Sequence, residues 1–324
     1  MFCIVLYSGC NKDKTSGDNS QLWETVVPDT LTNVKINAIC EYSDKSVWVG
    51  TNQGIWVFND TVLTATITTH DGLPDNNIQD IKKYNRNELL IFTGTGINRY
   101  DGTMHVVNTD SIDYRSYSHF AVDPDDNIWM LTSDAYSNRK GLLKLSNGKA
   151  TYYDPAGAAG YRGFDSENYT YVYADSQGRI WIGYYYTEIV LFKVENGKID
   201  YFDTDKLIDV YAITGDTKNN IWITSDFSLV KFDGTNFTSY SDEDIYGLFG
   251  SVFVADHTDD IWVANHNKIN KLHNGTWETE YVWSENNPWQ DPGADYVNYI
   301  IMMEDSRHYI WVCTDKGIMR KDDI

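Results

Sequence analysis

The sequence predicts an all-β fold, a seven-bladed β-propeller, and three observations support this prediction. A short strand centred on an aromatic residue occurs seven times along the 324 residues. A hairpin signal, Asn-Gly or Asp-Gly, follows most of the copies. A strand at the N-terminus resembles the strand that the last repeat lacks. Repeats of about 40 to 50 residues, each with four short strands, are typical of propellers.

The centre of the repeated strand is Trp in six copies and Phe in one. Successive centres lie 44, 37, 52, 41, 40 and 49 residues apart, which suits four short strands and their turns. A buried Trp removes on the order of 150–250 Å² from water, so we expect these rings to be core residues. The seven centres are Trp48, Phe92, Trp129, Trp181, Trp222, Trp262 and Trp311.

An aspartate stands six residues before the aromatic centre in five copies. A carboxylate at this point can accept hydrogen bonds from backbone N–H groups and close a tight turn. We therefore expect turn residues here, and neither metal ligands nor catalytic groups. The five are Asp123, Asp175, Asp216, Asp256 and Asp305.

The strand after each aromatic strand leads into a further hairpin. Asn-Gly and Asp-Gly are strong hairpin signals because both central residues of the turn take positive φ. A fourth strand follows, for example at residues 237–240. The dipeptides start at Asp101, Asn147, Asn196, Asp233 and Asn274.

The two ends of the repeat array are complementary: one lacks a strand and the other has an extra one. The last repeat stops at Ile324, after its third strand. Residues 22–26, Leu-Trp-Glu-Thr-Val, resemble the fourth strand at residues 276–280, Thr-Trp-Glu-Thr-Glu. We expect the N-terminal strand to complete the last blade and to cover its open edge. The propeller would then occupy residues 22–324.

The formal charge of −21 argues against nucleic acid as a partner, because nucleic-acid binding depends on clusters of Lys and Arg. The apolar run at residues 2–7 is too short to cross a bilayer. Followed by Ser, Gly and Cys10, it resembles a bacterial lipoprotein signal, which implies lipidation of Cys10. Alternatives are a start codon further upstream or an unstructured end. Residues 11–21 are polar, and we expect them to form a flexible tether.

Removal of such a signal would leave Cys40 and Cys313 as the remaining thiols besides Cys10. A disulfide across the ring closure is conceivable, but we expect two buried free thiols.

Residues 69–78, Thr-His-Asp-Gly-Leu-Pro-Asp-Asn-Asn-Ile, and the recurring Asp-x-x-x-x-Ile-Trp-Ile/Val resemble the two-component regulator propeller repeat. The resemblance covers residues 22–324. It implies the propeller fold of extracytoplasmic sensors of hybrid histidine kinases in Bacteroidota, where propellers help to detect oligosaccharides. These 324 residues contain no kinase or receiver region. The resemblance therefore implies a scaffold and a cell-envelope location at the outer membrane, periplasmic or surface-exposed.

Loop length distinguishes the two faces of the expected propeller. The connections between second and third strands, and from each fourth strand to the next blade, share one face, which we call the loop face. They are long at residues 154–168 and 283–297 and elaborated at 132–140 and 184–188, and they carry aromatic residues. The turns of the opposite face, the turn face, are short.

Aromatic rings with polar edges suit a sugar or a protein partner. Some of these rings could instead only cover the ends of neighbouring blades. The predicted ligand-binding residues are Tyr117, Tyr136, Tyr161, Arg162, Tyr169, Tyr184, Tyr185, Tyr186, Trp283, Trp289 and Tyr299.

No catalytic motif, cofactor motif or metal-ligand spacing is apparent, and the seven histidines show no paired spacing. His257 and His308 are expected on the turn face. We expect a non-catalytic envelope module that docks a glycan or an outer-membrane protein complex, with no cofactor, no metal, and membrane contact only through a lipid anchor. The alternatives are a sensor that reports to a separate signalling partner, and a polysaccharide lyase or hydrolase.

Overall fold

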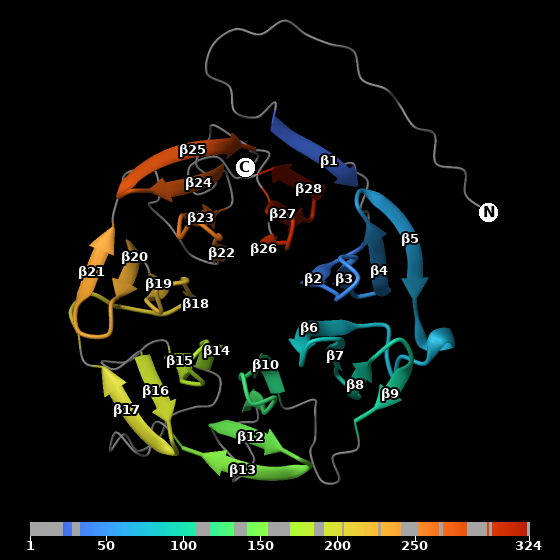
Figure 1. Cartoon of the computed structure of the whole chain (residues 1–324), viewed down its shortest axis with the longest axis horizontal. Coiled ribbons are helices and arrows are strands. Elements are labelled where there is room, and N and C mark those ends of the chain that lie inside the picture. Colours follow the sequence, from blue (N-terminus) through green and yellow to red (C-terminus); the bar gives the residue numbers. More distant parts are fainter. Residues whose placement is uncertain are drawn as a thin grey trace, which may run out of the picture.

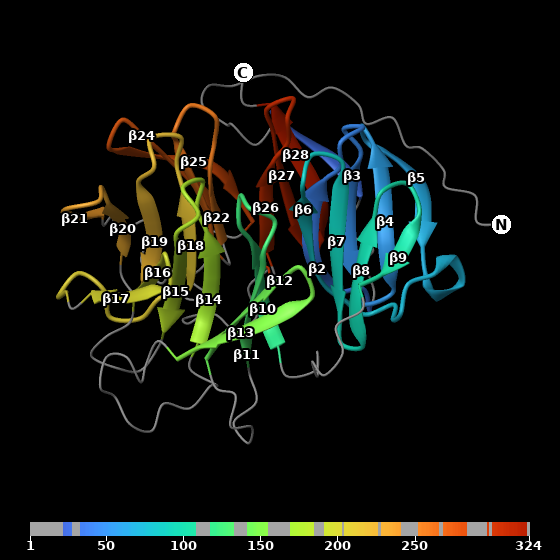
Figure 2. The same ribbon diagram turned by 60° about the horizontal axis from the view of Figure 1, so that its bottom comes forward.

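The computed structural model describes residues 22–27, 33–107, 117–132, 141–154, 169–184, 191–202, 204–225, 228–240, 252–265, 268–283, 297 and 300–322. Within them the strands form seven four-stranded antiparallel sheets arranged as a ring (Figure 1; tilted view in Figure 2). Each sheet is one blade, with its first strand nearest the centre and its fourth strand at the rim (Figure 1). The predicted seven-bladed propeller is confirmed. No helix among the described residues is long and apolar enough to cross a membrane.

The first three blades follow the chain from residue 36. Blade 1 contains β2 (Ile36–Glu41), β3 (Val47–Thr51), β4 (Gly54–Asn59) and β5 (Val62–Ile67). A short 3-10 helix, η2 (Thr69–Asp71), leads to blade 2. Blade 2 contains β6 (Ile78–Tyr84), β7 (Glu88–Thr93), β8 (Gly96–Tyr100) and β9 (Met104–Val106). Blade 3 contains β10 (Tyr117–Val122), β11 (Ile128–Thr132), β12 (Leu142–Ser146) and β13 (Lys149–Tyr153).

The other four blades complete the ring. Blade 4 contains β14 (Tyr169–Ala174), β15 (Ile180–Tyr184), β16 (Leu191–Glu195) and β17 (Lys198–Phe202). Blade 5 contains β18 (Ala212–Gly215), β19 (Ile221–Ser225), β20 (Ser228–Phe232) and β21 (Phe237–Tyr240). Blade 6 contains β22 (Val252–Ala255), β23 (Ile261–Ala264), β24 (Lys268–His273) and β25 (Thr276–Val282). Blade 7 contains β26 (Ile300–Glu304), β27 (Tyr309–Thr314), β28 (Gly317–Asp322) and β1 (Trp23–Val27).

The repeat tryptophans are core residues, as predicted. Each of the six is at most 5% exposed. The core consists of apolar clusters that join neighbouring blades; one of them packs Trp262 of blade 6 against Ile300, Ile310 and Val312 of blade 7. The rings therefore hold adjacent sheets together face to face.

The repeat aspartates are turn residues, as predicted, and they also have a second role. In blade 3, Asp123 Oδ1 accepts hydrogen bonds from the backbone N–H groups of Asp125 and Asn127, at 3.0 and 2.9 Å. Asp123 Oδ2 accepts the indole N–H of Trp129 at 2.8 Å. The same Asp–Trp hydrogen bond occurs in blades 4, 5, 6 and 7, at 2.7 to 2.9 Å. One carboxylate thus closes the turn and satisfies the buried indole.

Blades 1 and 2 lack the aspartate, and their central aromatic residues are accommodated in other ways. In blade 1, Trp48 donates its indole N–H to Ser46 Oγ at 3.0 Å, and Ser46 in turn donates to Asp44. In blade 2, Phe92 has no polar atom to satisfy, and its ring stacks on Phe120 of blade 3 at 4.1 Å.

The ring closes through β1, as predicted. It pairs antiparallel with β28, where Trp23 lies opposite Lys321 (Figure 1). The Trp23 indole N–H donates to the Glu280 carbonyl of blade 6 at 3.2 Å. Glu24 accepts a hydrogen bond from Arg320 at 2.8 Å. The N-terminal strand therefore joins blade 7 and also contacts blade 6.

Cys40 and Cys313 are buried and free, as expected. Burial raises the pKa of the Cys40 thiol to about 12, and burial also raises the pKa of Cys313. Neither thiol is a reactive nucleophile in this environment.

Replacing Asp123 with Ala should leave the Trp129 indole and two turn N–H groups without their acceptor. We expect the free energy of unfolding to fall by about 2–4 kcal/mol, the range for breaking a buried hydrogen-bond network. Urea unfolding followed by Trp fluorescence measures the change. Asp125→Ala, at an exposed position of the same turn, is the control and should change stability by less than about 0.5 kcal/mol. Equal stability of the two variants would contradict the proposed role of Asp123.

Candidate functional site

Most of the predicted ligand-binding residues lie outside the described part of the chain: Tyr136, Tyr161, Arg162, Tyr185, Tyr186, Trp289 and Tyr299. The predicted lipidation site, Cys10, lies outside it as well. Tyr117 and Tyr169 are the first residues of β10 and β14, so their backbones stand at the loop-face ends of two innermost strands. The description does not extend to those two side chains.

Tyr184 does not lie on the surface, which corrects the expectation of an exposed ring. Its side chain is fully buried and packs edge-on against Phe192, with ring centroids 6.3 Å apart. It belongs to the core cluster that joins blade 4 to Trp129 and Leu131 of blade 3. The reason is that Tyr184 is the last residue of β15, a strand that is buried at every position, and not the first residue of a loop.

Trp283 is the predicted residue that the structure places beside a pocket. Its half-buried ring contacts Tyr281 edge-on, with centroids 5.4 Å apart. The pocket has a volume of about 360 Å³ and lies between blades 6 and 7. It opens on the loop face, because it is bounded by the β27–β28 connection and by the residues that leave β25. Its lining includes Val27, Tyr281, Trp283, Thr314, Lys316 and Met319.

The lining of this pocket combines an aromatic surface with polar groups. Tyr281 and Trp283 supply the rings, and Lys316 supplies a positive charge. The Thr314 hydroxyl shapes the turn, since it donates to the Gly317 carbonyl at 3.2 Å and accepts the Lys316 N–H at 3.0 Å. Pockets of a few hundred Å³ with this mixture are typical of small-ligand sites.

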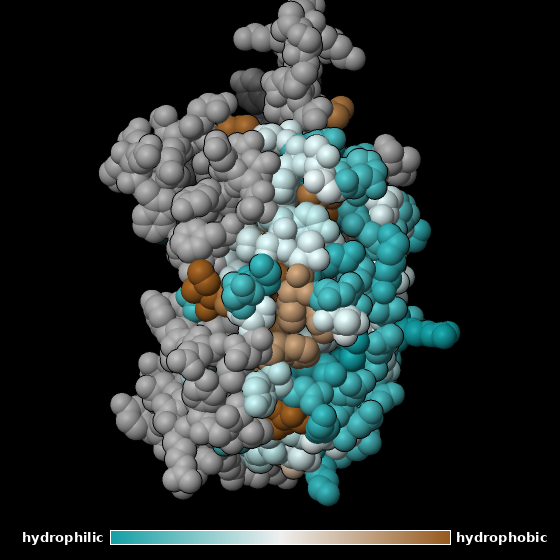
Figure 3. Space-filling model, turned by 90° about the vertical axis from the view of Figure 1, so that its left-hand side faces the viewer, coloured by the Kyte–Doolittle hydropathy of each residue, from teal (hydrophilic) through white to brown (hydrophobic). Residues whose placement is uncertain are grey.

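The outer surface differs from this pocket. Figure 3 shows the side of the molecule that carries β17 and β21, where the described residues are largely hydrophilic. The apolar residues visible there form small separate patches. Among the described residues of this side, such small patches are ordinary surface.

A polar group that was not predicted lies near the centre of the ring. Lys82 of β6 pairs with Asp80 at 3.0 Å, and the His119 ring of β10 lies 6.3 Å from the Tyr171 ring of β14. Burial, together with the positive charge of Lys82, lowers the pKa of His119 to about 4. Burial raises the pKa of Tyr171. His119 and Tyr171 are therefore uncharged at neutral pH.

This central group can donate and accept hydrogen bonds, but its geometry offers no activated nucleophile. Its members come from three repeats and stand on strands, where single polar residues are common. No signal in the sequence separated them from other strand residues.

Among the described residues, one group of side chains has the composition of a metal site: His257, Glu304 and His308. It lies on the turn face, where both histidines were expected, and away from the Trp283 pocket. Nothing in the sequence pairs the two histidines, because they belong to different blades. Although the histidines show no paired spacing in the sequence, His257 and His308 meet in the fold.

The comparisons with known proteins address the repeat and the fold. A family model described as two component regulator propeller matches residues 30–53 and 163–186, which contain Trp48 and Trp181. The chain carries two-component regulator propeller repeats. A search of curated proteins found no match.

Solved structures share the propeller fold. The extracellular domains of the hybrid two component systems BT4673 and BT3049 from B. thetaiotaomicron are each 17% identical, with TM-scores of 0.67 and 0.68. The alignments cover 93% of this chain and only 39% and 41% of those chains. Virginiamycin B lyase from Staphylococcus aureus is 15% identical, with a TM-score of 0.67 over 92% of this chain and 98% of the lyase. One fold thus serves extracellular domains and an enzyme, so it assigns no activity by itself.

The depressed pKa of His119 predicts a specific pH dependence. The unfolded chain binds a proton near the ordinary pKa of 6.5, whereas the folded chain does so near 4. The stability that a neutral His119 provides is therefore complete above pH 6.5 and is lost as the pH falls toward 4. His119→Gln should lose less stability than the wild type across this interval. Urea midpoints measured at several pH values check this; identical pH profiles would show that His119 titrates normally.

Proposed function

We propose that this propeller is a non-catalytic binding module of the cell envelope that recognises an oligosaccharide through the Trp283 pocket. The observation that carries the proposal is the pocket of about 360 Å³ on the loop face, with Trp283 and Tyr281 in its wall. Sugars present apolar C–H faces and hydroxyl edges, so they bind where a ring lies beside polar groups. Lys316 would favour a sugar that carries an acidic group.

The cellular setting supports the same proposal. The chain has regulator propeller repeats, and solved extracellular domains of two component systems share its fold. A lipidated Cys10 and a tether at residues 11–21 would hold the propeller at a membrane surface, periplasmic or exposed. A separate signalling partner could then detect the bound oligosaccharide. The alternative function, a sensor, would therefore depend on the same binding event.

The test of this proposal should avoid the core. A substitution at Tyr184 would remove a fully buried ring and destabilise the blade, so a loss of binding would be uninformative. Trp283 directly follows β25 and is half-buried; it packs against the core cluster of blades 6 and 7 without being one of its buried members.

Trp283→Ala should weaken oligosaccharide binding at least about tenfold, because aromatic anchors at the centre of a site carry about 2 kcal/mol or more. A glycan array identifies the ligand, and calorimetry measures the affinity of both forms. Trp277→Ala is the control, since Trp277 is also a half-buried Trp and lies near the start of β25, the strand that Trp283 follows. It should bind with wild-type affinity.

Two results would contradict glycan recognition by this pocket. One is equal affinity of the Trp283 and Trp277 variants for the ligand. The other is no glycan signal for the wild type together with co-purification of an envelope protein, which would favour a docking scaffold. Circular dichroism of all three forms ensures that each is folded.

A further inference from the structure

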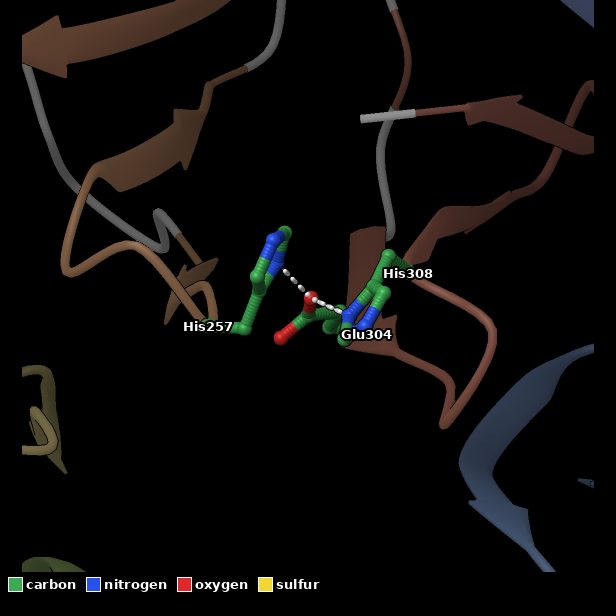
Figure 4. A group of neighbouring side chains, drawn as sticks. All are labelled: His257, Glu304 and His308. Carbon is green, nitrogen blue, oxygen red and sulfur yellow. Dashed lines mark hydrogen bonds and ion pairs between the residues drawn. The ribbon is translucent and has the colours of Figure 1, made fainter. Parts of the chain in front are cut away.

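The turn face holds three side chains that meet across the joint between blades 6 and 7. His257 lies in the turn between β22 and β23, directly after the repeat residue Asp256. Glu304 is the last residue of β26, and His308 lies in the turn that follows it. Figure 4 shows the Glu304 carboxylate between the two imidazole rings, with His257 arriving from the neighbouring blade.

The geometry concentrates three potential ligand atoms on one point. Glu304 Oε1 lies 2.6 Å from His257 Nδ1 and 3.0 Å from His308 Nδ1. The two rings face each other, with centroids 3.8 Å apart and planes inclined by 31°. The Glu304 side chain is 14% exposed, whereas the imidazoles are 34% and 40% exposed. The carboxylate is therefore more buried than the two imidazole rings, which are partly exposed to solvent.

Other joints on the turn face are held by simpler contacts between the same two positions. Between blades 5 and 6, Asp259 accepts hydrogen bonds from the Thr217 backbone and hydroxyl, each at 2.7 Å. Between blades 4 and 5, Ser176 donates to Asn219 at 2.7 Å. Those small polar pairs join the blades without imidazoles.

The backbone at His308 makes the histidine more unusual. Its φ is +68°, in the left-handed region that favours Gly, Asn and Asp. The corresponding turn positions are Asn219 in blade 5 and Asp259 in blade 6, with φ of +63° and +68°. A histidine is thus not needed to form the turn or to join the blades.

We propose that His257, Glu304 and His308 bind a divalent transition-metal ion, with Zn²⁺ as the reference case. Imidazole nitrogen and carboxylate oxygen are the ligands that Zn²⁺ accepts, and three protein ligands leave a position for solvent or a further donor. The three ligand atoms lie within 4.8 Å of one another. Ligands around tetrahedral zinc are about 3.3 Å apart for bonds of about 2.0–2.1 Å. Small side-chain movements would therefore replace the two hydrogen bonds with metal bonds.

The site is independent of the oligosaccharide proposal, because it lies on the opposite face and shares no residue with the Trp283 pocket. A bound ion would link blade 6 to the blade that β1 completes. It would stabilise the folded ring in proportion to its occupancy, because the unfolded chain has no preformed site.

The test uses the whole chain without a histidine tag, stripped with a chelator. Co²⁺ is the spectroscopic probe, because its visible bands report four or five ligands, and Zn²⁺ is the competitor. We expect saturable binding of one ion per chain, displacement by Zn²⁺, and a higher Tm with the metal.

The variant His257→Ser/His308→Asn installs the Ser176–Asn219 pair of the blade 4–5 joint, so the turns and the joint should be retained. It should lose at least about tenfold in metal affinity, together with the visible bands and the Tm increase. Glu304→Gln tests the third ligand with little change in shape and should also weaken binding. His105→Ala is the control. His105 Nε2 lies 3.0 Å from Asp101 Oδ1 on blade 2, so this substitution removes one histidine–carboxylate pair away from the proposed site.

Absence of Co²⁺ binding by the wild type would overturn the proposal. So would an affinity, spectrum and Tm shift that are unchanged in the folded double variant. Loss of binding in His105→Ala to the same degree would also overturn it, since the ion would then be held elsewhere.

Discussion

The hydrogen bond between a repeat aspartate and a buried indole is the interaction on which the blades depend. The ring of Trp129 packs against the neighbouring blade only because its N–H has an acceptor inside the protein. Asp123 can supply that acceptor only because its other oxygen is held by the turn. A local turn and a long-range packing contact thus share one carboxylate. This sharing explains why the two residues keep a constant spacing in five blades.

A basic side chain lies over the repeat tryptophan in several blades. Lys271 lies over the Trp262 ring at 4.6 Å and also 3.7 Å from Asp256, and Arg320 lies over Trp311 at 5.5 Å. Lys271 compensates the charge of the nearly buried Asp256 carboxylate, and both cations contact a ring face. The residue opposite each of these tryptophans on the third strand is the basic one.

The fold could be predicted almost completely from the sequence, because a repeated local pattern was enough. The spacing of Trp and Asp, the Asn-Gly turns and the similarity of residues 22–26 to 276–280 all refer to short segments. Blade 1 is an exception that the repeat pattern did not predict. There, Ser46 and Asp44 in the turn take the place of the usual aspartate, and neither belongs to the repeated sequence pattern. The candidate sites were less predictable. Tyr184 was misplaced because the end of β15 could not be distinguished from a loop, and His257 and Glu304 meet across 47 residues of sequence.

The pairing of β1 with β28 determines when this chain can finish folding. Glu24 and Arg320, which form one of its contacts, are separated by 296 residues. During synthesis, Trp23 leaves the ribosome well before its partner strand, because the strands of blades 1 to 6 lie between them in the sequence. Blades 1 to 6 each consist of consecutive strands and can form in order, whereas the N-terminal strand has to wait with an unpaired edge and an uncovered indole. Such non-local pairing is slow, and the waiting strand is open to wrong partners, including the same edge of another copy. The strand that closes the ring is therefore also the point at which a nascent chain is most exposed to misassembly.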